Sequence, residues 1–301
     1  MPELPEVETV ARQLQARLPG HGIATVRVLR ADALGDVPPA DFAAALEGRR
    51  FGAITRRGKY LLMALEPDLH LVAHLRMTGK FVLVDDPTET GKHDRVRFEL
   101  TPPQTSNGGV NTGRQGKGPQ DSRKDSPAAL VFQDMRCFGT LRLCADPEAL
   151  PGVAALGVEP LSRDFSPTWL VAALGATDRP LKHFLMDQGR IAGLGNIYAS
   201  EILFRAGLSP FLPARQVTPT GARALHGATR AILKAAIASN GTTISDFRPV
   251  DSKTGEFQNF LKVYGKTGQP CPKCRAPIQR AVQQQRSTFW CAHCQEGPAH
   301  G

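Results

Sequence analysis

The second residue of the chain is a proline, and an acidic residue follows it directly. Once Met1 is removed, the nitrogen of Pro2 becomes a secondary amine at the N-terminus. An α-amino group ordinarily has a pKa of about 7.7–8.0, far below the roughly 10.4 of lysine, so much of it is an uncharged nucleophile near pH 7. Glu3 can serve beside it as a general acid or base. The same residues also suit the first turn of a helix, where proline and acids are favoured, so both interpretations stay open.

Four of the six cysteines lie near the end of the chain and form two C-x2-C pairs, Cys271 with Cys274 and Cys291 with Cys294. Each pair supplies two thiolates from one tight turn, and together the pairs can close a tetrahedral shell around zinc. Because no position is left open for water, such an ion stabilises the fold and does not catalyse. The spacing therefore predicts one structural Zn²⁺.

A cluster of cationic residues precedes one of the apolar runs. Its members are Arg49, Arg50, Arg56, Arg57 and Lys59. The cluster is either a solvated basic turn or the phosphate-binding edge of a cleft, in which Lys59, nearest the apolar run, is best fixed for a specific role. Basic residues also surround the cysteine pairs, which indicates a zinc-stapled hairpin that contacts nucleic acid.

Two short segments place a large apolar residue near a basic one at the end of an apolar run. Met77 lies within His74–Gly79, and Phe138 follows Arg136 closely within Asp134–Gly139. Apolar tips on basic loops suit wedges that enter a base stack. Taken singly, a methionine or phenylalanine is more often a core residue, so this interpretation depends on the rest of the chain.

The segment from Gly193 to Tyr198 precedes a helical pattern and offers backbone N–H groups to an anion. It lacks the order of the G-x-G-x-x-G motif and the βαβ context, which excludes a dinucleotide site.

Composition bounds the class of protein. The 301 residues are 41% hydrophobic and 22% charged, which is ordinary for a globular protein with more than one domain. The sequence contains neither an apolar run long enough to span a membrane nor a signal peptide pattern, so we expect a cytoplasmic, nucleoid-associated protein without a membrane partner. The formal net charge of +9 favours a polyanionic partner.

The periodicity of apolar residues predicts the elements that must position these side chains. Val7, Val10, Leu14 and Leu18 share one face of a helix that carries the N-terminus. Short runs between residues 22 and 144 predict an antiparallel sandwich or barrel. These runs are 23–28, 60–65, 69–75, 81–84, 96–100, 129–132 and 140–143. Helical patterns follow at 167–174, 181–188, 197–206 and 220–239, so a domain boundary falls near residue 150. We expect the polar, glycine-rich stretch at 101–128 to be a disordered insertion.

Together the motifs closely resemble the bacterial formamidopyrimidine-DNA glycosylase family, from Pro2 to Cys294. Besides the cysteine pairs, the matching stretches are Pro2–Glu6, Arg57–Tyr60, His74–Gly79, Lys92–Asp94, Asp134–Gly139, Met186–Gln188, Ala192–Glu201, Gly241–Thr243, Val263–Gly265 and Gln285–Phe289. The resemblance implies an α+β multidomain fold. Its parts are an N-terminal antiparallel β-sandwich domain with flanking helices (1–150), a helix–two-turn–helix domain (151–260) and a C-terminal four-cysteine zinc finger (261–301).

The resemblance also implies a reaction on damaged double-stranded DNA, carried out by a monomer. Oxidised purines, chiefly 8-oxoguanine and formamidopyrimidines, are excised through a Schiff base on Pro2, and β,δ-elimination then cleaves the strand. Glu3 protonates the opening sugar, and Lys59 is the proton donor for β-elimination. Arg286 matches the donor for δ-elimination, but because an arginine hardly releases a proton we regard it first as a phosphate clamp.

Further residues match DNA-binding positions of the family. Glu6 resembles an acid that orients the sugar or base. Five residues match phosphate contacts: His93, Arg136, Lys182, Asn196 and Tyr264. Three match the group that fills the gap left by the flipped base: Met77, Arg136 and Phe138. The sequence departs from the family pattern at one position, where Thr177 stands in place of an expected lysine and Arg179 lies nearby.

Two alternatives remain. An enzyme of the endonuclease VIII type would act on oxidised pyrimidines, but the Pro2–Pro5 start and the long 246–258 segment, which resembles a loop that closes over 8-oxoguanine, argue against it. A non-catalytic zinc-ribbon DNA-binding protein would need neither Pro2 nor Lys59, and borohydride would trap no adduct with it.

Overall fold

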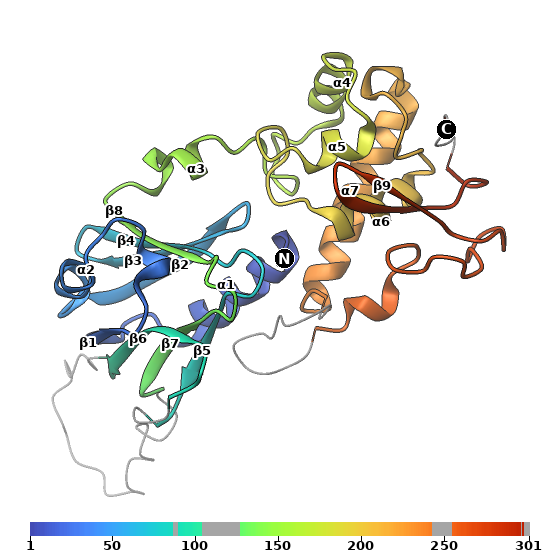
Figure 1. Ribbon diagram of the computed structural model, residues 1–301. Helices are drawn as coiled ribbons and strands as arrows, with labels where there is room; N and C mark the ends of the chain where they lie inside the picture. Colours follow the sequence, from blue (N-terminus) through green and yellow to red (C-terminus); the bar gives the residue numbers. More distant parts are fainter. Residues whose placement is uncertain (87–89, 104–126, 243–254, 296, 298–301) are drawn as a thin grey trace, which may run out of the picture.

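The computed structural model describes residues 1–86, 90–103, 127–242, 255–295 and 297. A sheet lobe and a helical lobe lie side by side, with the N-terminal helix between them and a two-stranded hairpin on the helical lobe (Figure 1). This arrangement confirms the predicted α+β fold. Most of the expected insertion, 104–126, lies outside the described residues.

The sheet lobe contains eight strands in the order β5-β7-β6-β1-β2-β3-β4-β8, each antiparallel to its neighbours. The strands are β1 (Gly22–Val28), β2 (Arg50–Arg57), β3 (Tyr60–Glu66), β4 (Leu69–His74), β5 (Lys80–Val84), β6 (Asp94–Thr101), β7 (Ala129–Gln133) and β8 (Thr140–Cys144). Strand β3 shows why these runs are strands, because Leu61, Met63 and Leu65 alternate inward while the residues between them are partly exposed.

The sheet folds over between β1 and β2, which pair only at Gly22 and Arg50. Side chains from both halves then meet in one core, including Phe98 and Phe132 from one half and Phe51 and Leu71 from the other. The predicted sandwich is therefore formed by one bent sheet. Helix α2 (Pro39–Leu46) and the short η1 (Ala31–Leu34), neither of which we predicted, add Phe42, Leu46 and Leu34 to this core.

Helix α1 (Leu4–Arg17) packs on both lobes. Val7, Val10 and Leu14 enter the core of the sandwich, as their spacing predicts, whereas Leu4 belongs to the core of the helical lobe. The helix begins with a proline in its first turn and a capping box between Glu3 and Glu6. Thus the N-terminal residues do open a helix, and they do so at the junction of the two lobes.

The helical lobe packs four longer helical segments around a second core. They are α4 (Pro167–Gly175), α5 (Leu181–Met186), α6 (Asn196–Ala206) and α7 (Pro219–Ala238). Short elements connect them to their neighbours: η3 (Pro147–Ala149), α3 (Pro151–Ala154), η4 (Ala214–Gln216) and η5 (Phe257–Phe260). The Ser166 hydroxyl caps α4 by accepting from Trp169 N at 3.1 Å, and Thr218 caps α7 in the same way. Helix α5 is shorter than predicted, ending at Met186.

The final hairpin consists of β9 (Gln279–Gln283) and β10 (Arg286–Trp290). Its small core combines Phe289 and Cys271 with Phe204 of α6, so the hairpin is anchored to the helical lobe. No helix within the described ranges is long and apolar enough to cross a membrane.

Candidate active site and metal centre

A cavity of about 500 Å³ lies where the two lobes and the final hairpin meet. Its lining residues come from the N-terminus, the sandwich, the interlobe link, the helical lobe and the hairpin. They are Met1, Lys59, Tyr60, His74, Arg76, Gly152, Ala155, Leu156, Met186, Gln188, Gly189, Leu194, Gly195 and Arg286. The fold therefore brings the chain terminus, Lys59 and Arg286, which are far apart in sequence, to one cavity.

Glu3 is buried beside this cavity, at the N-terminus of α6. Its carboxylate accepts hydrogen bonds from Ile197 N at 2.9 Å and Tyr198 N at 3.3 Å. The backbone N–H groups that the sequence offered to an anion are thus occupied by the protein's own carboxylate. Burial raises the pKa of Glu3 to about 7, although the nearby Lys59 opposes this shift. A carboxyl group with such a pKa exchanges protons near neutral pH and suits acid–base catalysis.

Glu6 is also buried and accepts four hydrogen bonds. The donors are Tyr198 Oη at 2.6 Å, Thr242 N at 2.7 Å, Thr242 Oγ1 at 2.9 Å and Glu3 N at 2.9 Å. Because its donors come from the chain start, α6 and the segment after α7, this carboxylate ties the N-terminus to the helical lobe. It orients Glu3 through the Glu3 backbone N–H.

Lys59 occupies the turn between β2 and β3 and is only 5% exposed. Its Nζ donates to the Leu194 carbonyl at 2.8 Å. Burial lowers the pKa of Lys59, while the negative charge of Glu3 opposes the shift. A lysine with a lowered pKa is a better proton carrier near neutrality than an exposed one.

The loop before α6 approaches the N-terminus closely and has little room for side chains. Gly193 has a φ of +86° and its carbonyl accepts from Leu4 N at 3.0 Å, while a Cβ there would overlap Leu4. A Cβ at Gly195 would overlap the Glu3 carboxylate. Gln188 holds the loop by donating to Leu194 O at 2.8 Å and accepting from Gly193 N at 3.0 Å. The Leu194 carbonyl that holds Lys59 is therefore itself fixed.

Two of the residues that we expect to contact phosphates also hold the hairpin. Lys182 is fully buried, and its Nζ donates to Ser287 O at 2.9 Å and Thr288 Oγ1 at 2.7 Å. Asn196 Nδ2 donates to the same Ser287 carbonyl at 2.9 Å. Since Ser287 follows Arg286, these bonds fix the strand that aims Arg286 at the cavity.

Tyr264 is positioned by contacts to helix α6 and to the hairpin. The carboxylate of Glu201, buried on α6, accepts from Tyr264 N and Val263 N at 2.9 Å each, and also from Lys262 N. The Tyr264 ring packs edge-on against Phe289 of the hairpin, with ring centroids 5.0 Å apart. The link between α7 and the zinc finger is thereby tied to the helix that bears Asn196.

The three expected gap-filling residues lie on two adjacent loops of the sandwich. Met77 and Phe138 are 40% and 52% exposed, so both are surface residues and not core residues. The Arg136 guanidinium stacks over the Phe138 ring at 4.9 Å. The loops are joined because Arg136 N donates to Thr78 Oγ1 at 3.1 Å. His93 does not line the cavity, but it lies beside these loops, since its carbonyl accepts from Asp134 N.

Most of the basic cluster lies on strand β2, with Arg49 just before the strand and Lys59 in the turn after it. Its arginines have partners inside the protein. Arg56 pairs with Glu8 at 2.8 Å and with Glu159 at 2.7 Å, and Arg57 donates to Leu156 O and Gly157 O. Glu159 Oε1 also accepts from Gly58 N at 2.6 Å. Of this cluster, Lys59 alone lines the cavity, and Arg56 and Arg57 fix the link between the lobes.

The four C-terminal cysteines converge, with all Sγ atoms within 4.8 Å of one another. Two of the Sγ–Sγ distances are 3.9 Å, for Cys271 and Cys294, and 3.5 Å, for Cys274 and Cys291. A tetrahedral Zn²⁺ with Zn–S bonds of about 2.3 Å needs sulfurs roughly 3.8 Å apart. The donor set and spacing fit one structural zinc ion, as the sequence predicts.

Removal of the zinc is expected to loosen the hairpin, because the small core of the finger includes the zinc-binding residues Cys271 and Cys291. Lys182 and Asn196 still hold Ser287, but Trp290 of β10, which packs against Phe211 of the helical lobe with ring centroids 4.8 Å apart, should become more exposed. In a Trp169→Phe variant, which leaves Trp290 as the sole tryptophan, chelation should shift the emission to longer wavelength as zinc is released. Emission that stays unchanged after complete zinc release, measured with a chromogenic dye, would contradict a structural role.

Several residues of this site were not predicted from the sequence. Tyr198 and Gln188 fall within matching stretches, but no local pattern indicates that they hold Glu6 and the 193–194 loop. His74, whose pKa burial lowers to about 3, also faces the cavity. Its position at the end of a predicted strand was the sequence signal that could have identified His74 as a site residue.

Comparison with known proteins gives matches over nearly the whole chain. Residues 1–141 match the formamidopyrimidine-DNA glycosylase N-terminal domain, 156–248 the formamidopyrimidine-DNA glycosylase H2TH domain, and 268–297 a zinc finger found in FPG and IleRS. The chain is 38% identical to the formamidopyrimidine-DNA glycosylase of Chloroflexus aggregans over 295 residues, 98% of each chain. It is 40% identical to that of Rhodospirillum rubrum over 306 residues, 98% of this chain and 100% of the relative.

Solved structures give the same result. The crystal structure of the MutM (Fpg) protein from Thermus thermophilus superposes with a TM-score of 0.81 at 39% identity, covering 99% of this chain and 100% of that one. Fpg from Lactococcus lactis in complex with DNA containing an abasic site superposes with a TM-score of 0.84 at 32% identity. That match covers 98% of this chain and 100% of the relative.

Proposed function

The chain belongs to the formamidopyrimidine-DNA glycosylase family, and from this membership and the geometry of the cavity we propose that it excises oxidised purines from DNA and then cleaves the strand at the abasic site. The carrying observation is that the chain start, Lys59 and Arg286 line one cavity, with Glu3 buried beside it. A DNA-binding module without catalysis has no need for such an arrangement.

The first step uses the secondary amine that Pro2 carries after removal of Met1. Its lone pair attacks C1′ of the damaged nucleotide, and the bond between C1′ and the base breaks. The base leaves with the electron pair and takes up a proton, and the Pro2 nitrogen loses one. Glu3 in its protonated form donates to the sugar ring oxygen as the ring opens. Its raised pKa supports this role, because a substantial fraction of the group is protonated near pH 7.

Strand cleavage follows from the iminium that a secondary amine forms. Its positive charge makes the C2′ proton acidic, and loss of that proton expels the 3′ phosphate. We assign the proton transfer of this β-elimination to Lys59, and its burial, its lowered pKa and its hydrogen bond to the Leu194 carbonyl support the assignment. A second, δ-elimination releases the sugar and leaves phosphates on both sides of the gap.

The remaining residues hold DNA. Arg286 is a permanent cation at the cavity, and we assign it to a phosphate of the lesion. The exposed Met77, Arg136 and Phe138 fill the space that the flipped nucleotide leaves, which offsets part of a flipping cost of a few kcal/mol. Five further residues are proposed as contacts to the sugar, base or phosphates: Glu6, His93, Lys182, Asn196 and Tyr264.

We also propose that the chain works as a monomer in the cytoplasm, with functional units at 1–150, 151–260 and 261–301. Three separate hydrophobic cores support these divisions. The preference for purines over pyrimidines rests on the Pro2–Pro5 start and on the relatives, since residues 243–254, which include much of the 246–258 segment, lie outside the described part.

A duplex with 8-oxoguanine opposite cytosine, incubated with Pro2-terminated protein and borohydride, tests the proposal. We expect a covalent protein–DNA adduct, and without borohydride a gap with phosphates at both ends. A duplex with undamaged guanine is the control. No adduct from verified Pro2-terminated protein would overturn the mechanism, and an adduct only on a thymine glycol duplex would move the substrate class to oxidised pyrimidines.

A further inference from the structure

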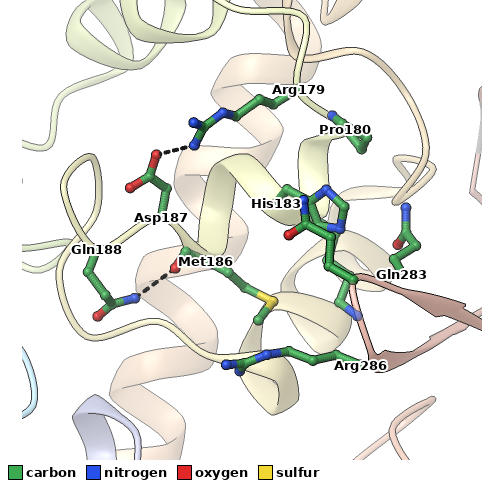
Figure 2. A pocket seen from close by; sticks show the side chains of 10 residues that line it. Arg179, Pro180, His183, Met186, Asp187, Gln188, Gln283 and Arg286 are labelled. Atoms are coloured by element: carbon green, nitrogen blue, oxygen red, sulfur yellow. Dashed lines mark hydrogen bonds and ion pairs between the residues drawn. The ribbon is translucent and has the colours of Figure 1, made fainter.

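A second cavity, of about 530 Å³, lies between α5 and the turn of the final hairpin (Figure 2). It is lined by Arg179, Pro180, Lys182, His183, Met186, Asp187, Gln188, Gln283, Gln284 and Arg286. Four of these are basic, three are amides, and Asp187 is the only acid among the described lining residues. The excess of positive charge and hydrogen-bond donors indicates an anion site.

This cavity adjoins the first one, because Met186, Gln188 and Arg286 line both. Arg286 thus stands between the place where strand cleavage is proposed and the basic cavity. An anionic group formed in the first cavity therefore arises close to the second.

Asp187, the one acid among the described lining residues, has hydrogen-bond and ion-pair partners besides Arg179. Asp187 Oδ2 pairs with Arg179 Nη1 at 2.6 Å, but it also lies 3.5 Å from Arg190 Nε, and Oδ1 accepts from Gly189 N at 3.1 Å. Arg179 is 58% exposed, so it can turn to another anion at small cost. Asp187 then keeps Arg190 and Gly189.

His183 has a ring nitrogen, Nε2, that is buried and has no hydrogen-bond partner within the described part of the protein. Burial lowers the pKa of His183, and the positive charges of Lys182 and Arg179 lower it further. In the tautomer that carries its proton on Nε2, this ring can donate to an anion bound in the cavity, close to the positive charges of Lys182 and Arg179.

We propose that this second cavity binds a terminal phosphate monoester of the gapped DNA that strand cleavage leaves. This inference rests on the proposed function. A phosphate monoester carries about −1.5 to −2 charges at pH 7 and three acceptor oxygens, whereas an internal phosphodiester carries one negative charge. Arg179, His183 and Arg286 together match the more highly charged group, so the cavity distinguishes a cleaved end from continuous DNA.

The test measures binding to ready-made duplexes with a one-nucleotide gap, whose ends bear either phosphates or hydroxyl groups. Fluorescence anisotropy should give about tenfold or tighter binding with phosphates, the size expected of one or two charge-assisted hydrogen bonds. Single-end phosphates identify which end enters the cavity. Arg179→Gln and His183→Gln should each reduce the phosphate preference to about twofold.

Arg190→Gln is the matched control, because Arg190 also pairs with Asp187 but does not line the cavity, and it should keep the full preference. Inorganic phosphate should displace the phosphorylated duplex and not the hydroxyl duplex at matched ionic strength. Equal binding of both duplexes, or a uniform loss of affinity for both in Arg179→Gln, would overturn the proposal. Since the gaps are made beforehand, this outcome is independent of whether the protein cleaves 8-oxoguanine DNA.

Discussion

A chain that keeps Met1 is expected to cleave no DNA at 8-oxoguanine and to form no adduct with borohydride, while it binds DNA with little change. The Pro2 nitrogen is then an amide, whose lone pair is delocalised and cannot attack C1′. Met1 also lines the cavity that the sugar would enter. Loss of a covalent nucleophile costs about 10⁴-fold to 10⁶-fold in rate.

The comparison requires protein whose first residue is known from intact mass. Pro2→Gly, after Met1 removal, is the matched variant because its primary amine can still condense with C1′. We expect it to trap a reduced but measurable amount of adduct, and the chain that retains Met1 to trap none. Trapping by the Met1-bearing chain at the same rate as the Pro2-terminated chain would mean that another amine is the nucleophile, and Lys59 would be the first to examine.

Glu3→Gln is expected to slow base excision by about 10²-fold to 10⁴-fold, the usual contribution of a positioned acid or base. The carboxamide keeps the size of the side chain and still accepts a hydrogen bond from Ile197 N, but it has no acidic proton to give. Cleavage of a preformed abasic site should suffer less, because part of that sugar is already in the open aldehyde form, which Pro2 can attack without protonation of the ring oxygen. Equal losses on the 8-oxoguanine duplex and on the abasic duplex would contradict a role of Glu3 in base excision.

The pH profile gives an independent check on Glu3. The pKa of about 7 means that the protonated form falls tenfold for each pH unit above that value. Excision by the wild type should therefore decline above about pH 7, whereas residual excision by Glu3→Gln should lose this limb. Single-turnover rates on the 8-oxoguanine duplex between about pH 5.5 and 9 measure both. If the decline in excision rate above about pH 7 persists in Glu3→Gln, the titrating group is not Glu3.

The raised pKa also has a consequence for folding. Its folded value lies above that of the unfolded chain, so the folded state binds more protons between about pH 4.5 and 7. Stability attributable to Glu3 therefore falls as pH rises through this window, and the cost of its ionisation is present in full above pH 7. A salt-bridged carboxylate has the opposite pH dependence of stability. The difference arises because burial is the main cause of the raised pKa of Glu3.

The sequence alone predicted the features that depend on residues close together in the chain. Val7, Val10 and Leu14 repeat on one helix face, and the apolar residues of β3 alternate along a strand, because secondary structure has these periods. The cysteine pairs are equally direct, since zinc requires their spacing. These predictions are confirmed by the sheet lobe, the helices and the converging sulfurs.

Strand β2 escaped prediction because its charged residues have partners remote in sequence. Arg56 resembles a surface residue until Glu159, 103 positions later, is placed against it. The contacts within the candidate site could not be predicted for the same reason, since they join residues far apart in the sequence. Tyr198 meets Glu6 across 192 positions, and Lys59 binds the carbonyl of Leu194, a group that every residue possesses. The assigned roles of these residues remain predictions, which the experiments above test.

The bonds between Glu3 and the start of α6 also impose an order on the life of a newly made chain. Ile197 is synthesised 194 positions after Glu3, and at about 5–20 residues per second the ribosome needs roughly 10–40 s to reach it. During that interval the N-terminus has no helical lobe to cover it, and an aminopeptidase can reach Met1. Afterwards Pro2 and Glu3 are buried. We therefore expect Met1 to be removed more readily during translation than after folding, which would make early processing decide how much of the protein is active.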